Sequence, residues 1–170
     1  MKKITVCAIL VSLALVLAIV ERGIPFELIS PVPGIKIGLP NIITLFALFF
    51  LDLRSVFAIV ILRCILVAIL VGSFSSFAFS ITGGIFALII MIFLKKGYNN
   101  LFSMIGISIA GAAFHNIGQI IMACILLKSF SIFAYLPLLL LTSIATGLIT
   151  GIIGEELVKR MSKIMHSIYQ

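Results

Sequence analysis

Acidic residues are scarce in this chain of 170 residues, which contains five Asp and Glu in total against twelve Lys and Arg. Charged residues make up only 10% of the sequence and hydrophobic residues make up 63%. A soluble domain carries roughly 25% charged residues because its surface must face water. This chain has too few polar residues to cover such a surface, so most of its exterior must face lipid. We expect an all-α integral membrane protein with a single transmembrane domain over residues 1–170.

The shortage of carboxylates also limits the chemistry that the chain can perform. Asp52 is its only aspartate, whereas magnesium-dependent diphosphate chemistry usually needs several clustered carboxylates to hold the metal. The sequence contains no GxxxxGK[ST] nucleotide-binding loop, no HExxH and no GxSxG motif. We expect no catalytic residues, no metal and no cofactor, so the chain alone is not an enzyme.

Cysteines are few, and they do not form a recognisable pattern. Cys7, Cys64 and Cys124 each lie inside an apolar run, and an odd number without CxxC spacing predicts free thiols. The first apolar run is not followed by a clear small-x-small cleavage site. This favours a signal anchor that stays as the first helix over a cleaved secretory signal.

Six apolar runs are separated by charges, prolines and polar clusters. They predict six transmembrane helices at approximately 4–20, 37–51, 55–71, 80–94, 102–127 and 134–157. A helix needs about 20 residues to cross the hydrocarbon core, so the second and fourth runs are short. The fourth opens with residues 80–84, SITGG, a poor helix start that could leave the backbone unwound. Short segments interrupted by Gly or Pro point toward a binding site.

The basic residues are distributed unequally over the connecting segments. With the N terminus inside, eight lie in inside segments and three in outside segments; the inside eight are Lys2, Lys3, Arg54, Lys95, Lys96, Lys159, Arg160 and Lys163, and the outside three are Arg22, Lys36 and Lys128. The positive-inside rule then predicts a multi-pass protein of the cytoplasmic membrane with both ends in the cytoplasm. Because these charges flank apolar runs and form no stripe, no nucleic-acid partner is expected.

The first outside loop, residues 21–36, is the longest and most polar connection. Three prolines stiffen it. It is either a structured lid over a site or an ordinary solvated connection, and the sequence leaves both interpretations open.

Arg63 lies near the middle of the third apolar run, where an arginine costs about 2.5–3.5 kcal/mol to insert. It must face the bundle interior or a wet cavity. The five acidic residues lie at the ends of runs or in loops. An arginine without an internal counter-ion favours an anionic ligand, and the alternative is a structural arginine bonded to helix carbonyls or an amide.

The fifth run carries small and polar residues at helical spacing, among them His115, Asn116 and Gln119. Such side chains either contact a ligand or hydrogen-bond between helices, and we expect ligand contact for at least one of the three. In the second run, Asn41 and Thr44 share a face near the outer surface and could close a site from above.

Small residues also recur in the first and last runs. Ser143, Gly147, Gly151 and Gly154 form one stripe, which favours close helix packing over ligand contact. Ala14 and Ala18 form another pair one turn apart, a flat patch where the helix of a partner could approach.

Several strings together carry a family resemblance over most of the chain. They are residues 33–45 (PGIKIGLPNIITL), Arg63, residues 80–84 (SITGG), residues 111–119 (GAAFHNIGQ) and residues 147–151 (GLITG). The chain resembles the Gx transporter family, also labelled heptaprenyl diphosphate synthase component I. It is similar to the S components of energy-coupling factor (ECF) transporters, which are six-helix bundles with both ends cytoplasmic. The uncertain outer half of the fourth run departs from that pattern.

The resemblance implies a function through partners. S components capture vitamins or related small molecules from outside, and a coupling subunit with two ATPases drives transport. In that group an Ala-x-x-x-Ala pair on the first helix contacts the coupling subunit, and Ala14 and Ala18 fit this pair. The sequence therefore favours a substrate-capture subunit for a small anionic molecule. The alternative is a non-catalytic membrane component of heptaprenyl diphosphate synthase, which the family label supports.

Overall fold

A computed structural model describes residues 3–23, 36, 38–71 and 74–168, without the side chains of 71 and 163–168. The elements are α1 (Lys3–Arg22), α2 (Asn41–Phe50), α3 (Leu53–Val71), α4 (Phe74–Lys95), α5 (Met104–Leu127), the 3-10 helix η2 (Phe130–Tyr135) and α6 (Leu136–Ile168). In these residues the only β pairing is an isolated bridge between Tyr98 and Phe102. The all-α fold is confirmed. Most of the loop at 21–36 lies outside the described residues, so its two interpretations stay open.

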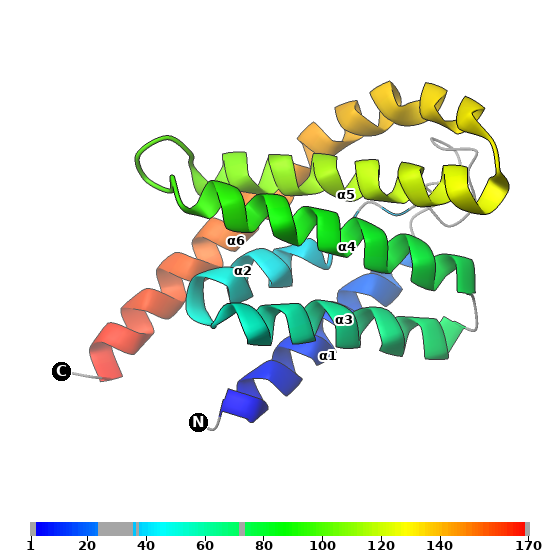
Figure 1. The fold of residues 1–170 in the computed structure, drawn as a ribbon. Helices are drawn as coiled ribbons and strands as arrows, with labels where there is room; N and C mark the ends of the chain where they lie inside the picture. The colour runs from blue at the N-terminus through cyan, green and yellow to red at the C-terminus, as the bar shows by residue number, and fades with distance from the viewer. Residues whose placement is uncertain (1–2, 24–35, 37, 72–73, 169–170) are drawn as a thin grey trace.

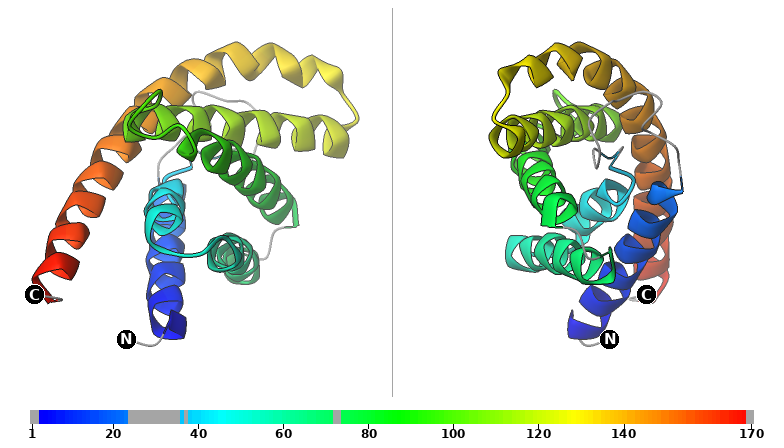
Figure 2. Two further views of the ribbon diagram at one scale, coloured as in Figure 1. Left: turned by 60° about the vertical axis from the view of Figure 1, so that its left-hand side comes forward. Right: turned by 90° about the vertical axis from the view of Figure 1, so that its right-hand side faces the viewer.

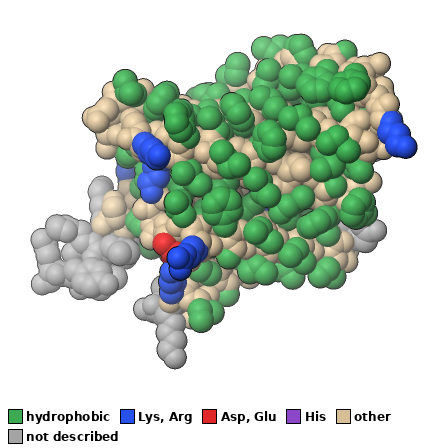
Figure 3. All heavy atoms as spheres, viewed as in Figure 1, with side chains coloured by type: hydrophobic (Ala, Val, Ile, Leu, Met, Phe, Trp, Pro, Cys, Tyr) green, Lys and Arg blue, Asp and Glu red, His purple; other side chains and the backbone are tan. Residues whose placement is uncertain are grey.

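Five helical segments of the described chain are long and apolar enough to cross a membrane: α1, α3, α4, α5, and α6 together with η2. A helix can cross the hydrocarbon core because its backbone N–H and C=O groups are hydrogen-bonded within the segment, where no water is available to pair them. Hydrophobic side chains cover most of the face in Figure 3, and Lys and Arg gather toward its two ends. The prediction of an integral membrane protein is therefore confirmed.

The second helix differs from the prediction of a crossing helix over 37–51. α2 has 10 residues, which at 1.5 Å per residue span about 15 Å, half of the hydrocarbon core. Residues 39 and 40 form a turn, and the helix begins at Asn41 directly after Pro40. Non-helical backbone at membrane depth is tolerated only where it is buried in protein. Gly38 and Pro40, in the non-helical segment before α2, are buried, as this rule requires.

The fourth helix also differs from its prediction. α4 begins at Phe74, six residues before the expected start, and residues 80–84 are helical. The hydroxyl groups of Ser80 and Thr82 donate 2.7 Å hydrogen bonds to the carbonyls of Ser76 and Ala78, one turn earlier. These bonds satisfy the polar side chains inside the helix. The unwound start predicted from the Gly-Gly pair is therefore wrong.

Both termini lie at the same end of the bundle (Figure 1). The α2–α3 and α4–α5 connections lie at this end, and the turn from α5 to η2 lies at the opposite end. Figure 2 shows α6 arching along one side of the bundle to the C terminus. This arrangement agrees with the expected alternation of crossings. Which end faces the cytoplasm stays a prediction from the charge distribution.

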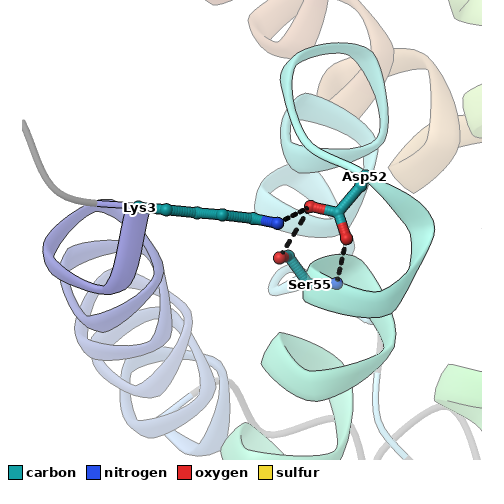
Figure 4. Close-up of polar contacts among 3 residues, drawn as sticks. All are labelled: Lys3, Asp52 and Ser55. Carbon is teal, nitrogen blue, oxygen red and sulfur yellow. Dashed lines mark hydrogen bonds and ion pairs between the residues drawn. The ribbon is translucent and has the colours of Figure 1, made fainter.

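An ion pair ties the start of α1 to the α2–α3 turn. Lys3 Nζ lies 2.5 Å from Asp52 Oδ1, and the Ser55 hydroxyl donates to the same oxygen at 2.9 Å (Figure 4). These contacts, that of Lys3 first, lower the pKa of Asp52 to about 2. Lys95 at the end of α4 donates to the Leu48 carbonyl of α2 at 2.5 Å. Basic residues therefore gather where the inside charges were expected.

The glycine stripe on α6 packs against α5. A Cβ added at Gly147 would lie 2.5 Å from Ile109 Cα, and one at Gly151 would lie 2.8 Å from Ile105 Cα. Any larger residue would push the two helices apart, because interiors have no spare volume for it. The packing interpretation of this stripe is confirmed.

Ala14 and Ala18 are not on the surface of α1. Their side chains are 1% and 5% exposed, and Ala14 belongs to the main hydrophobic core. The lipid-facing side of α1 carries Leu13 and Val16 instead. The expectation that the alanine pair forms an accessible partner-binding patch is therefore wrong, since the bundle of this chain already covers both side chains.

Candidate functional site

A small cavity lies between α1, α3, α4, α5 and the segment before α2. Its volume is about 20 Å³, room for about one water molecule. Its charged or strongly hydrogen-bonding lining residues are Glu21, Lys36, Arg63, Ser80 and His115. Two of the residues predicted from sequence, Arg63 and His115, thus line one cavity.

The cavity lies in the half of the bundle farther from both termini. Glu21 is the penultimate residue of α1, and Ser80 is in the second turn of α4. Both positions are toward the end of the bundle opposite Lys3 and Asp52 (Figure 1). With both termini in the cytoplasm, this half of the bundle would face the outside.

Arg63 points into this cavity from the middle of α3. Its side chain is 4% exposed, and its Nε has no hydrogen-bond partner within the described residues. A Cβ added at Gly84 would lie 3.0 Å from Arg63 Nη2. The second glycine of the SITGG string thus leaves room for the guanidinium group.

Glu21 brings a negative charge to the same cavity. The side chain is 4% exposed, and its Oε1 accepts hydrogen bonds from the backbone N–H groups of Gly38 and Leu39. The interpretation that Arg63 has no acidic neighbour inside the bundle is therefore wrong. Sequence reasoning missed Glu21 because it stands at the end of an apolar run, where a charge normally meets water.

Lys36 is the second residue that sequence reasoning missed, having been counted among the outside charges. Its Nζ donates 2.8 Å hydrogen bonds to the hydroxyls of Ser76 and Ser80 on α4. Burial lowers the pKa of Lys36 from its usual 10.5 to about 8, and the charge of Glu21 opposes this effect. The signal in the sequence was a lone charge within a Gly, Pro and aliphatic segment directly before an apolar helix.

Gln119 connects Lys36 to His115. The backbone N–H of Lys36 donates to Gln119 Oε1 at 3.1 Å, so the amide nitrogen of Gln119 points the other way. That Nε2 lies 3.0 Å from His115 Nε2. An amide nitrogen only donates, so this ring nitrogen accepts and carries no proton. The imidazole of His115 is therefore neutral in this arrangement.

Two glycines make room for the His115 ring. A Cβ at Gly83 would lie 2.8 Å from the ring atoms Cε1 and Nδ1. Gly38 has a φ of +92°, which other residues rarely adopt, and a Cβ there would lie 3.1 Å from the ring. The PGIKIGLP and SITGG strings are thus spatially related through His115.

Gln119 contacts the lining residues Lys36 and His115 but does not itself line the cavity. The remaining predicted site residues do not line it either. Asn116 faces α6, where its Nδ2 donates to the Leu139 carbonyl and the Ser143 hydroxyl, each at 2.9 Å. Thr44 is buried in α2. Asn41 is buried beside Gly38, and both polar atoms of its amide lack a partner within the described residues.

The assembled groups suit anion binding. Lys36 and Arg63 supply cations to the cavity, and Ser80 supplies a hydroxyl group. Within the described residues no three His, Cys, Asp or Glu side chains are grouped to hold a metal ion. The geometry thus offers recognition by charge and hydrogen bonding.

These features define the chain as a helical membrane protein with a cationic cavity inside its bundle. Residues 10–157 match the family described as heptaprenyl diphosphate synthase component I, and the chain belongs to this family. No curated protein and no solved structure matches the chain. The family predicted from the sequence strings is confirmed, whereas the likeness to ECF S components stays a prediction.

Proposed function

We propose that this chain is the membrane-embedded substrate-capture subunit of an ECF-type uptake transporter. The observation that carries this proposal is a pair of cations in one cavity inside the bundle, the buried Arg63 and the half-buried Lys36. Buried cations inside a membrane protein are costly and usually mark a substrate or ion pathway. The substrate is then a small anion, and Arg63 is its principal anchor because guanidinium binds carboxylates through a rigid fork of donors.

Three further predicted residues have supporting roles in this proposal. His115 and Gln119 lie on the side of α5 that faces the cavity. Gln119 accepts from the backbone N–H of Lys36 and donates to His115, and so positions both residues. Asn41, whose amide is buried without partners, would gain them from a bound ligand. Thr44 and Asn116 serve packing around the site, so we no longer propose direct ligand contact for them.

Substrate entry requires the cavity to enlarge. Small-molecule sites usually measure about 300–1,000 Å³, whereas this cavity measures about 20 Å³. The bonds from Lys36 to Ser76 and Ser80 join the segment before α2 to α4. In this proposal they separate when substrate enters, and the substrate takes over the pairing of Lys36. The described conformation, with its cavity of about 20 Å³, then corresponds to a closed form.

Transport by this mechanism requires partners, since the sequence has no nucleotide-binding loop. We propose a membrane coupling subunit and two ATPases. Because Ala14 and Ala18 are buried, any docking on α1 uses its exposed side, where Leu13 and Val16 lie.

The second candidate function is a non-catalytic membrane component of heptaprenyl diphosphate synthase, which the family description favours. Its partner would be a soluble subunit with the clustered aspartates that this chain lacks. The two functions therefore predict different partners, and a single preparation of the protein can distinguish them.

Copurification from the native membrane in mild detergent separates the two candidates. The transporter proposal predicts ATPase subunits and a second membrane protein in stoichiometric amounts. Recovery of a soluble polyprenyl synthase subunit, without ATPases, would overturn it in favour of the second candidate. An exchange of Leu13 and Val16 for Ala on the exposed side of α1 tests whether the partner docks there, and an exchange on the lipid-facing side of α6, such as Ile149→Ala, is the matched control.

A further inference from the structure

Asn41 is a buried residue beside the cavity whose side-chain amide the fold leaves unused. Its side chain is 4% exposed, and neither its Nδ2 nor its Oδ1 has a hydrogen-bond partner within the described residues. Nearly all buried polar groups in proteins are paired, because an unpaired one is destabilising. An amide that the fold itself does not pair is therefore a candidate for pairing with a ligand.

The position of Asn41 at the start of α2 does not account for its amide. An asparagine near the start of a helix commonly caps the free backbone N–H groups of the first turn. Asn41 is the first residue of α2, yet its Oδ1 accepts no such bond. The backbone N–H groups of residues 42–44 donate instead to the carbonyls of Leu39 and Pro40. The start of the helix is thus satisfied without the side chain of Asn41.

A fixed turn holds this amide beside the cavity. The backbone N–H of Asn41 donates to the Gly38 carbonyl at 2.9 Å, and the backbone N–H of Gly38 donates to Glu21 Oε1 on α1. A Cβ added at Gly38 would lie 2.9 Å from Asn41 Nδ2 and 3.1 Å from His115 Cδ2. Gly38 and His115 both line the cavity. The amide therefore lies directly behind this part of the wall, where Gly38 has no side chain to cover it.

The guanidinium group of Arg63 also has a buried nitrogen, Nε, without a partner within the described residues. Resting on the proposed function, we infer that the captured anion carries a second polar feature, an N–H group next to a carbonyl group, as in a carboxamide, a lactam or a ring ureide. Arg63 binds the anionic end. Asn41 pairs with the other feature through two hydrogen bonds, because a side-chain amide offers both a donor and an acceptor.

The test uses three carboxylates that share a six-membered ring and a single negative charge at pH 7. Orotate carries ring N–H groups next to carbonyl groups, orotate methylated at both ring nitrogens keeps only the carbonyls, and benzoate carries neither. The full-length chain in detergent is titrated with each probe, and its thermal unfolding midpoint gives the apparent affinity. We expect the wild type to bind orotate about tenfold more tightly than either of the other two, the scale of two net hydrogen bonds.

Asn41→Leu removes both polar groups of the amide and keeps a side chain of similar size. This variant should bind all three probes alike, at the affinity that the wild type has for benzoate. Without a probe its unfolding midpoint should equal or exceed that of the wild type, because no hydrogen bond is lost. The matched control is Thr44→Val, a buried polar residue of the same helix that does not line the cavity, and it should keep the preference for orotate.

Each contrary result has a distinct meaning. A wild type that binds the three probes equally overturns this inference and leaves anion capture intact, whereas a wild type that binds none of them overturns the proposed function as well. A preference for orotate that survives in Asn41→Leu, or a lower midpoint of this variant without a probe, shows that Asn41 does not read the ligand. If Asn41→Leu does not fold, the comparison of orotate with its methylated form on the wild type decides.

Discussion

The side-chain nitrogen of Lys36 lies 2.8 Å from the hydroxyl oxygen of Ser80, 44 residues further along the chain. This contact brings a residue of the connection between α1 and α2 into the interior of the bundle, against the second turn of α4. The SITGG string begins at Ser80 and the PGIKIGLP string contains Lys36. Their proximity is why two separate sequence motifs contribute to one cavity.

The first prediction concerns pH and Lys36. Because the folded-state pKa of about 8 lies below the usual 10.5, the unfolded chain binds more protons between these values. The free energy of unfolding of the ligand-free protein should therefore rise as pH increases from about 8 to 10.5. Anion binding should weaken over the same range, because the ammonium group loses its charge. Thermal unfolding with and without benzoate, across pH, measures both trends.

Lys36→Gln is the control for this pH dependence. Glu21, Arg22, Arg63 and Cys64 also act on the charge of Lys36, and they remain in the variant. If Lys36 is responsible, both trends in this pH range should disappear. Unchanged trends in Lys36→Gln would show that another group titrates and that Lys36 does not bind the anion.

The second prediction concerns the alanine pair on α1. Ala14→Leu should lower the free energy of unfolding by about 1–3 kcal/mol, because added methylene groups overpack a core in which Ala14 is 1% exposed. Leu13→Ala, on the exposed side of the same turn, should have a much smaller effect. Chemical unfolding in detergent compares the two variants. Equal stability of Ala14→Leu and the wild type would show that this residue faces outward after all.

The third prediction concerns the different roles of Asn116 and Gln119 on α5. Asn116→Ala removes two hydrogen bonds between α5 and α6 and should lower stability by about 1 kcal/mol, the scale of such bonds in membranes. Its affinity for anionic probes should stay near that of the wild type. Gln119→Ala should weaken anion binding, because Lys36 loses the acceptor of its backbone N–H. Loss of binding in Asn116→Ala alone would contradict this division of roles.

The fourth prediction concerns sidedness. On a background without Cys7, Cys64 and Cys124, a cysteine placed at Lys128 should react with an impermeant thiol reagent in intact cells. A cysteine placed at Lys96, at the opposite end of the bundle, should react only after the cells are opened. The reverse pattern would place the cavity in the cytoplasmic half and exclude capture from outside.

Hydropathy and charge were sufficient to predict much of the fold. The five long helices follow from runs of apolar residues, since length and composition decide whether a segment can cross a membrane. The start of α4 was missed because Gly83 and Gly84 suggest a break. In the structure they pack against His115 and Arg63, and this tertiary packing outweighs their low helix propensity.

The site was predicted only in part, because sequence position does not show which way a side chain points. Arg63 and His115 are conspicuous in apolar runs and were found. Glu21 ends an apolar run and Lys36 lies between two runs, where charges normally meet water. Only the three-dimensional structure shows that both side chains line a cavity inside the bundle. Ala14 shows the converse, since a small residue on a helix marks close packing without saying whether the neighbour is another helix of the same chain.

Native mass spectrometry of the protein tests anion capture at Arg63 most directly. The wild type, purified from its own membrane, should retain a small anion with a stoichiometry near one per chain. Arg63→Leu should remain folded and extractable in detergent and should lose this anion. A folded Arg63→Leu that retains the same anion, or a wild type that carries none even when benzoate is supplied, would contradict the proposal that this cavity captures a small anion.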